Sequence, residues 1–390
     1  MKILFICGAL AAGEFVASYI PTCADVWPFM ALLTVLIVLF GYGVPVRGWS
    51  LAATFLAGMA LFLLASVEQE HLYREKPWLR GCLSHMQRTG SSPNGFAAGL
   101  KDDFSRRVGL GIDADREVVT LNRAILLGER FRLSQRLKRV FAASGTMHVF
   151  AISGLHVMAI ANVLIYFLAA LLVPRRLAGV FVMPFLWGYV HLIGLPPSAV
   201  RATLMASVCF LAPVLWRRPN LLRAWALTFL AVHILHPRMI VDVGNILSFT
   251  VMLAIALVVE YGLRTGLRVS FCWITVAVWA VGVPIAAHVF GQVAPGGILA
   301  NLVLITAAEW TVYTGAIGVI ISFASESVAG HFNNLSVLCT KAMVGISEFV
   351  SRLPGSSFEV SRWTILQCVE WYALIALIAF LVHLVRQRRF

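Results

Sequence analysis

Long apolar stretches recur along this chain, and they restrict its fold more than any other feature. About eleven of them approach the ~20 residues that a helix needs to cross a bilayer. They lie at 3–20, 27–44, 49–67, 148–173, 178–194, 198–216, 222–236, 239–261, 269–290, 296–323 and 364–386. In lipid a helix pairs its own backbone polar groups. We therefore predict an all-α polytopic integral membrane protein with about 10–11 transmembrane helices.

The composition agrees with this class. Of the 390 residues, 60% are hydrophobic and 13% are charged, whereas an average globular domain is about half apolar and a quarter charged. Glu14 interrupts the first apolar run and further spans follow it, so we expect a retained first helix instead of a cleaved signal peptide.

Basic residues in alternate short loops predict the orientation. These residues are Arg47, Arg175, Arg176, Arg217, Arg218, Arg223, Arg264 and Arg268. Cytoplasmic loops of inner-membrane proteins are enriched in Lys and Arg, which places residues 68–147 outside the cytoplasm. The net charge of +13 fits such orientation signals, and it also fits a path for a polyanion.

Residues 68–147 form the one long polar segment, with 14 Lys and Arg against nine Asp and Glu. Apolar residues at helical spacing predict two or three amphipathic helices close to the membrane. Their basic faces are either solvated surface or a collar at a pore mouth. We divide the chain into N-terminal transmembrane helices (1–67), this extracytoplasmic segment (68–147), a transmembrane channel domain (148–323) and an end (324–390) with an interfacial helix near 335–353 and a last span.

Polar residues inside apolar stretches are costly unless they are paired or used. Ser153, Gly154 and His156 interrupt the apolar run 147–167. A Ser three residues before a His is compatible with a nucleophile and its base, or with close helix packing and one hydrogen bond between helices.

Two other stretches combine a helix break with polar residues, and a third carries a polar stripe. In GLPPSAVRA (194–202), Ser198 is expected to cap a new helix that carries Arg201 beside the break. Such a cation suits an anion path, or it is an arginine whose charged end reaches the interface. Asp242, Asn245 and Ser248 form a polar stripe at helical spacing, and Asn301 follows a Pro-Gly-Gly break.

The chain shows no motif for nucleotide, zinc or dinucleotide binding. Its seven Cys are spread singly, so we expect no metal and no cofactor. Cys23 and Cys82 fall on the same predicted side of the membrane, so the sequence does not decide whether they form a disulfide.

Five motifs occur in an order that resembles the competence domain of the ComEC family of DNA-uptake proteins. They are LLGERFRLS (126–134), HVFAISGLHVMAI (148–160), GLPPSAVRATLM (194–205), HPRMIVDVGNILSF (236–249) and PGGILANLVLI (295–305). The family's GDR element reads GER here, a minor departure.

The resemblance implies an inner-membrane channel for single-stranded DNA in natural transformation. The channel motif would then contain Ser153, Gly154, Leu155 and His156, and further path positions would be Arg201, Ser248 and Asn301. Phosphate contacts are expected from Arg201 and the Arg-rich run 130–139.

The resemblance also limits the expected chemistry. Full-length members often carry OB-like and metallo-β-lactamase-like domains that these residues do not resemble, so we expect no enzyme. Expected partners are single-stranded DNA, membrane lipid and a separate DNA receptor, nuclease and cytoplasmic helicase, and a homodimer stays open. The alternatives are a small-solute permease and an intramembrane hydrolase that uses Ser153 and His156.

Overall fold

The computed structural model describes residues 95–112, 116–129, 133–150, 152–235, 239, 242–265 and 270–387. All residues before 95 lie outside these ranges, including the first three predicted spans, Glu14 and the pair Cys23 and Cys82.

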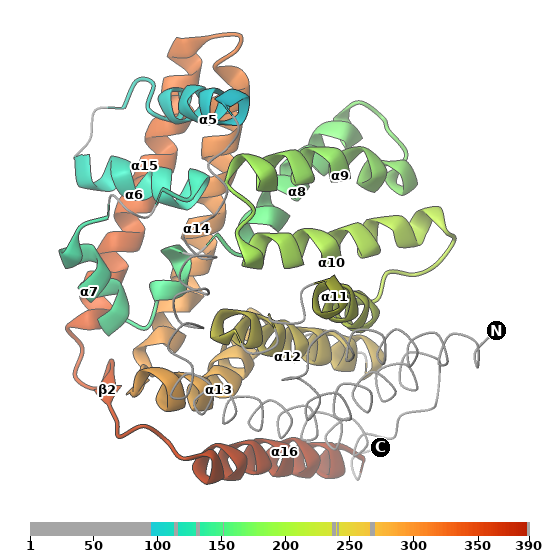
Figure 1. Cartoon of the computed structure of the whole chain (residues 1–390), viewed down its shortest axis with the longest axis vertical. Helices are drawn as coiled ribbons and strands as arrows, with labels where there is room; N and C mark the ends of the chain where they lie inside the picture. Colours follow the sequence, from blue (N-terminus) through green and yellow to red (C-terminus); the bar gives the residue numbers. More distant parts are fainter. Residues whose placement is uncertain are drawn as a thin grey trace.

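The described chain is almost entirely helical (Figure 1). Its elements in order are α5 (Gly95–Val108), α6 (Arg116–Leu127), α7 (Gln135–Ala143), the 3-10 helix η3 (Met147–Phe150), α8 (Gly154–Ala170), α9 (Arg175–Leu192), α10 (Pro197–Val214), α11 (Leu221–Leu235), α12 (Val243–Thr265), α13 (Phe271–Phe290), β1 (Gln292–Val293), α14 (Gly296–Ile321), α15 (Glu326–Ser351), β2 (Phe358–Glu359) and α16 (Ile365–Gln387). The two short strands pair antiparallel, with Gln292 opposite Glu359.

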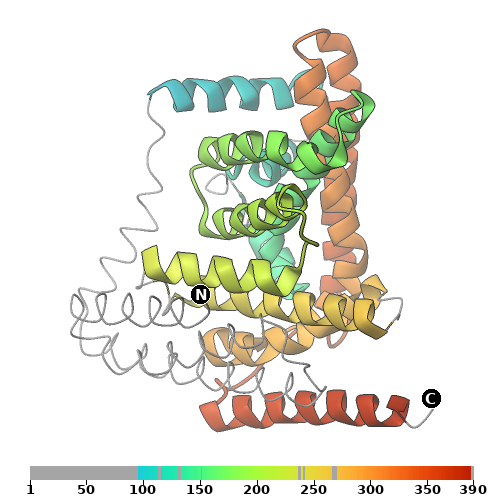
Figure 2. The same ribbon diagram turned by 90° about the vertical axis from the view of Figure 1, so that its right-hand side faces the viewer.

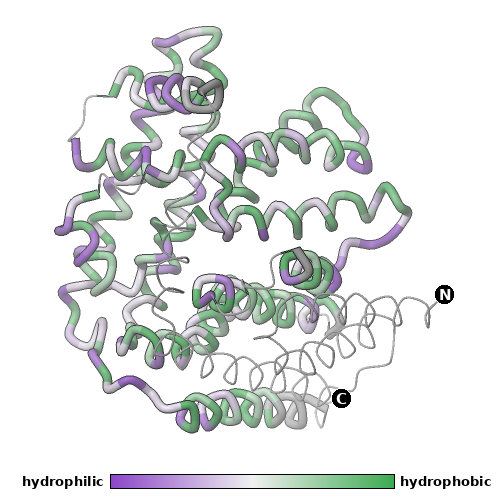
Figure 3. The backbone as a smooth tube through the Cα atoms, viewed as in Figure 1, coloured by the Kyte–Doolittle hydropathy of each residue, from purple (hydrophilic) through white to green (hydrophobic). Residues whose placement is uncertain are grey.

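The predicted all-α membrane fold is confirmed. Four helices in the described ranges, α10, α12, α13 and α14, are long and apolar enough to cross a bilayer, and α8, α11 and α16 contain shorter apolar segments. Each apolar stretch predicted from residue 148 onward coincides with one helix of the series α8 to α14 and α16. Hydrophobic residues dominate these helices, while hydrophilic residues gather on α5 to α7 (Figure 3). The total of 10–11 spans remains a prediction.

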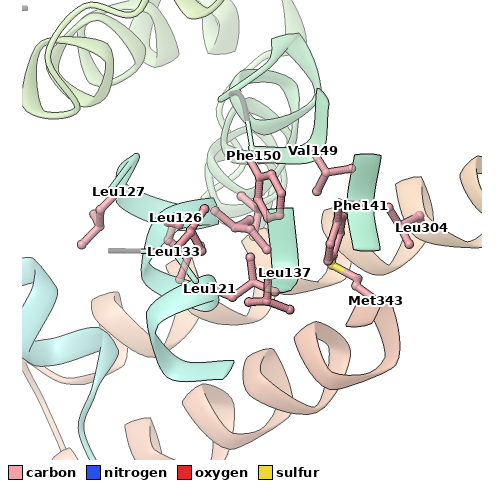
Figure 4. Close-up of a cluster of buried hydrophobic side chains, with 14 of the residues drawn as sticks. Leu121, Leu126, Leu127, Leu133, Leu137, Phe141, Val149, Phe150, Leu304 and Met343 are labelled. Carbon is pink, nitrogen blue, oxygen red and sulfur yellow. The ribbon is translucent and has the colours of Figure 1, made fainter. Parts of the chain in front are cut away.

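Three amphipathic helices, α5 to α7, occupy the described part of the predicted polar segment, as expected. The inner faces of α6 and α7 bury Leu121 and Phe141, which pack with Phe150, Leu304 and Met343 (Figure 4). Ser134 caps α7, because its hydroxyl oxygen accepts a hydrogen bond from the Leu137 backbone N–H. Such a cap pairs one of the free N–H groups at a helix start. The position of this segment outside the cytoplasm stays a prediction.

Helices α14 and α15 run side by side along the vertical axis in both views, whereas α16 lies across that axis (Figures 1 and 2). The Ser336 hydroxyl of α15 donates to the Thr311 carbonyl of α14 at 3.0 Å. A Cβ atom on Gly318 would lie 2.5 Å from Oδ1 of Asn333, so glycine allows this close approach, as small residues do between membrane helices. Helix α15 begins at Glu326, nine residues earlier than the expected start of the interfacial helix at 335.

Candidate functional site

A sharp turn between α9 and α10 positions the predicted arginine. Gly194 and Leu195 both have left-handed backbone conformations, with φ of 87° and 53°. Pro196 then precedes α10 and Pro197 is its first residue, a position that proline favours because its fixed φ suits a helix start. The predicted helix break is therefore confirmed.

The predicted cap by Ser198 is wrong. Pro196 takes the capping position, and Ser198 already lies inside α10. Its hydroxyl instead donates to the carbonyl oxygen of Ile152 at 2.5 Å. This bond ties the start of α10 to the segment that leads into α8.

Arg201 reaches from α10 to the first two turns of α12, and only 6% of it is exposed. Its Nε donates to the Ser248 hydroxyl at 3.1 Å, and its Nη1 donates to Oδ1 of Asn245 at 2.8 Å. A longer contact of 3.4 Å joins Nη2 to the Gly244 carbonyl. The predicted stripe on α12 thus faces the predicted arginine.

A second group of hydrogen bonds surrounds Asn245. Its Nδ2 lies 3.1 Å from Nε2 of His233 and 2.8 Å from the Met239 carbonyl. The Asp242 carboxylate accepts from the Asn245 backbone N–H at 2.7 Å, which pairs an N–H group at the start of α12. Asn245 therefore links α10, α11 and α12.

The partners of the Arg201 guanidinium are neutral. They are a hydroxyl, an amide oxygen and a backbone carbonyl. Within the described ranges no carboxylate lies at ion-pair distance from Arg201. The direct partners of the Arg201 cation are therefore dipoles, and the Asp242 carboxylate binds the Asn245 backbone instead of the guanidinium. A buried cation without an ion pair favours an anion as an additional partner.

The motif around Ser153 forms the start of α8. Ser153 takes the capping position, and Nδ1 of His156 lies 3.2 Å from the Ser153 backbone N–H and 3.1 Å from its hydroxyl. The His156 side chain is buried, with 1% exposed. The spacing of three residues between Ser and His is therefore the spacing of a reciprocal helix cap.

Gly154 and Leu155 fix this helix start against its neighbours. A Cβ atom on Gly154 would lie 3.3 Å from Cβ of Ala202, so α8 and α10 approach closely next to Arg201. Leu155 packs against the hydrophobic cluster of α6, α7 and α14. The Ser153 motif and Arg201 thus occupy adjoining parts of the α8 and α10 junction.

Asn301 lies apart from this cluster on α14. Its Oδ1 is buried and has no hydrogen-bond partner among the described residues, and no hydrogen bond in these ranges joins it to Arg201 or Ser248. The structure thus brings Arg201 together with Ser248, and Ser153 with His156, but leaves Asn301 separate.

The Arg-rich run is partly described. Arg136 pairs with Glu348 of α15 at 2.6 Å and with Glu117 of α6 at 3.4 Å. Arg139 is exposed, whereas Arg130 and Arg132 lie outside the described residues. Arg136 therefore joins three helices, and Arg139 remains available on the surface.

His233 is the main site residue that sequence reasoning missed. It is 7% exposed, and it lies in helix α11, which is mostly apolar after Arg223 in its first turn. The available signal was the presence of an ionisable residue in an apolar helix, which is costly without a partner.

Comparisons with known proteins identify the relatives of this chain. The sequence model of a family described as "Competence protein" matches residues 125–385. ComE operon protein 3 of Bacillus subtilis (strain 168) is 26% identical over 208 residues, which are 52% of this chain and 26% of that protein. The match therefore spans about a quarter of the curated relative, and no solved structure matches. Because the family match covers well over half of the chain and contains both the Arg201 cluster and the Ser153 motif, the chain belongs to the competence protein family.

Proposed function

We propose that this chain forms a conduit in the bacterial inner membrane for uptake of single-stranded DNA during natural transformation. The observation that carries the proposal is the Arg201 cluster, a buried guanidinium whose partners in the described ranges are neutral. A phosphodiester supplies a direct anionic partner for the guanidinium, which forms no ion pair within the described ranges, and arginine binds phosphate oxygens through two parallel hydrogen bonds. Membership of the competence protein family supports DNA as the anion.

The neutral partners explain how Arg201 can serve a moving strand. An arginine paired with a carboxylate has to lose that ion pair before it can bind phosphate, and breaking a buried pair is costly. Ser248 and Asn245 hold Arg201 through hydrogen bonds alone. A passing phosphate can take their place, and they can take it back when the phosphate leaves.

The other parts of the proposal follow from the sequence motifs. Ser153, Gly154, Leu155, His156, Ser248 and Asn301 line or gate the path within the domain 148–323. The segment 68–147 lies at its outer mouth, where the run 130–139 meets incoming phosphates. Within this run Arg139 is exposed, whereas Arg136 is paired with Glu117 and Glu348 and would have to leave these carboxylates first. The partners are DNA, lipid and a separate receptor, nuclease and cytoplasmic helicase. The chain acts as a multi-pass conduit and carries no catalytic step of its own.

Arg201→Gln tests the proposal because it keeps hydrogen-bonding groups and removes the charge. A charged hydrogen bond is worth about 1.5–3 kcal/mol, so uptake of labelled DNA into a nuclease-protected form should fall roughly tenfold or more. Arg201→Lys keeps the charge and should retain part of the uptake.

The matched control is Arg223→Gln, the same change at an exposed arginine of α11. It should leave uptake unchanged. Normal uptake in Arg201→Gln, at equal protein levels in the membrane, would exclude Arg201 from the path.

A further inference from the structure

We propose that His233 is a positioning residue for Arg201. Its neutral ring fixes the Asn245 amide in the one orientation that presents the amide oxygen to the guanidinium. Its relevance to DNA uptake rests on the function proposed for Arg201, whereas the positioning itself is a property of the cluster.

The hydrogen on the ring can be assigned from its neighbours. Nδ1 of His233 lies 2.7 Å from the Phe229 carbonyl oxygen. A carbonyl only accepts, so Nδ1 carries the hydrogen. In the neutral ring the other nitrogen, Nε2, then has a lone pair and accepts.

The Asn245 amide has matching groups on both sides. Its Nδ2 has two hydrogens, which point to Nε2 of His233 at 3.1 Å and to the Met239 carbonyl at 2.8 Å. Its Oδ1 then faces Nη1 of Arg201, a donor, at 2.8 Å. In the opposite orientation the amide NH₂ would face the guanidinium, and two donors would meet.

Met239 supports the same orientation, so His233 provides one of two acceptors. Without the His233 ring, one N–H of the Asn245 amide has no partner, and water is a poor substitute because Asn245 is 1% exposed. A hydrogen donor in place of Nε2 would be worse, because turning the amide to satisfy that donor would take Oδ1 away from Arg201. The site therefore requires an acceptor at the Nε2 position and excludes a donor there.

Aromatic neighbours hold the ring in this place. The ring centroids of His233 and Phe229 are 4.1 Å apart, and those of His233 and Phe249 are 5.4 Å apart. The charged side chains around the network are Arg201 of α10, reached through Asn245, and Asp242, which pairs with the Asn245 backbone. This packing restricts rotation of the ring, so the acceptor stays aimed at Asn245.

Two variants that differ by one methylene distinguish the loss of the acceptor beside Asn245 from a general change in packing. In His233→Gln, the amide oxygen reaches the former position of Nε2 and can accept from Asn245. In His233→Asn, the shorter side chain places its amide near the former position of Nδ1, so it cannot accept from Asn245. A third variant, His233→Phe, keeps a ring of similar size but has no acceptor.

The measurement is the rate at which phenylglyoxal, an arginine reagent, modifies Arg201 in the full chain in lipid nanodiscs. Mass spectrometry of the peptide gives the rate, and the exposed Arg223 in the same sample serves as the reference. Arg201 should react with phenylglyoxal at the same rate in the unsubstituted chain (the parent) and in His233→Gln. In His233→Asn and His233→Phe the rate should rise at least about fivefold, the factor that ~1 kcal/mol of lost stabilisation gives.

Equal rates in the Gln and Asn variants would overturn the inference, as would equal rates in the Phe variant and the parent. Each comparison stands alone, so a variant that fails to fold still leaves the other decisive. DNA uptake by the same variants separates the two proposals. If Arg201 protection follows the predicted order while Arg201→Gln takes up DNA normally, the positioning stands and the proposed function fails. If Arg201→Gln loses uptake while protection is unchanged in all variants, the function stands and the positioning fails.

Discussion

Replacing Asn245 by alanine removes three side-chain hydrogen bonds at once. They join the side chain to Arg201, His233 and the Met239 carbonyl. Since Asn245 is 1% exposed, water is a poor substitute for the lost amide. The guanidinium, the imidazole nitrogen and the carbonyl oxygen each lose one partner.

The expected loss of stability follows from these contacts. A hydrogen bond to a charged group is worth about 1.5–3 kcal/mol, and a buried polar atom left unpaired costs about 1–3 kcal/mol. Because neighbouring contacts are not additive, the sum is an upper limit, and we expect Asn245→Ala to lower the free energy of unfolding by about 3–5 kcal/mol. Ser248→Ala removes one bond of 3.1 Å to the same guanidinium, and we expect it to cost about 1–2 kcal/mol.

Unfolding by denaturant of the purified chain in detergent micelles measures both losses. Intrinsic tryptophan fluorescence reports the transition, because Trp225 is buried beside Phe249 in the same group of helices. Equal losses for Asn245→Ala and Ser248→Ala would refute the reasoning, since they would mean that the bonds to His233 and Met239 contribute nothing.

Three further predictions concern other contacts. Ser153→Ala removes the helix cap and should cost about 0.5–2 kcal/mol while DNA uptake persists at a reduced level; complete loss of uptake by a folded protein would favour a catalytic role for Ser153. Gly318→Ala places a Cβ atom 2.5 Å from Oδ1 of Asn333 and should cost about 1–3 kcal/mol in thermal unfolding, so an unchanged melting temperature would contradict the close packing of α14 and α15. Glu348→Gln weakens an ion pair with Arg136, whose side chain is 64% exposed, and should change stability in a denaturant titration by less than about 1 kcal/mol, so a larger loss would contradict its assignment as a surface pair.

The sequence was sufficient to locate the helices because hydrophobicity is a local property. Every apolar stretch from residue 148 onward lies on a helix. The start of α15 was predicted too late because residues 326–334, ESVAGHFNN, include five polar residues and therefore show no apolar run. Contacts with α5 and α14 stabilise this part, for example the bond from Asn333 to the Arg107 carbonyl.

The site was less predictable, because its contacts join residues far apart in the chain. The stripe on α12 was visible from spacing, but nothing in the spacing indicated that Arg201, 44 residues before Asn245, would face it. His233 was missed because a single polar residue has no period. The cap by Ser198 was wrong because two consecutive prolines allow two helix starts, and sequence alone does not choose between them.

The junction of α8 and α10 restricts how a path for a strand can open. At this junction the Ser198 hydroxyl bonds the Ile152 backbone, and Gly154 lies against Ala202. These contacts involve a backbone carbonyl and small side chains, so the starts of α8 and α10 cannot separate without losing them. On the side of α12, Ser248 is bound to Arg201 through its hydroxyl, whereas Asn245 is also held by His233 and the Met239 carbonyl. If DNA passes Arg201 as we propose, we expect the opening beside the guanidinium to start at Ser248, while Asn245 and the junction of α8 and α10 stay in place.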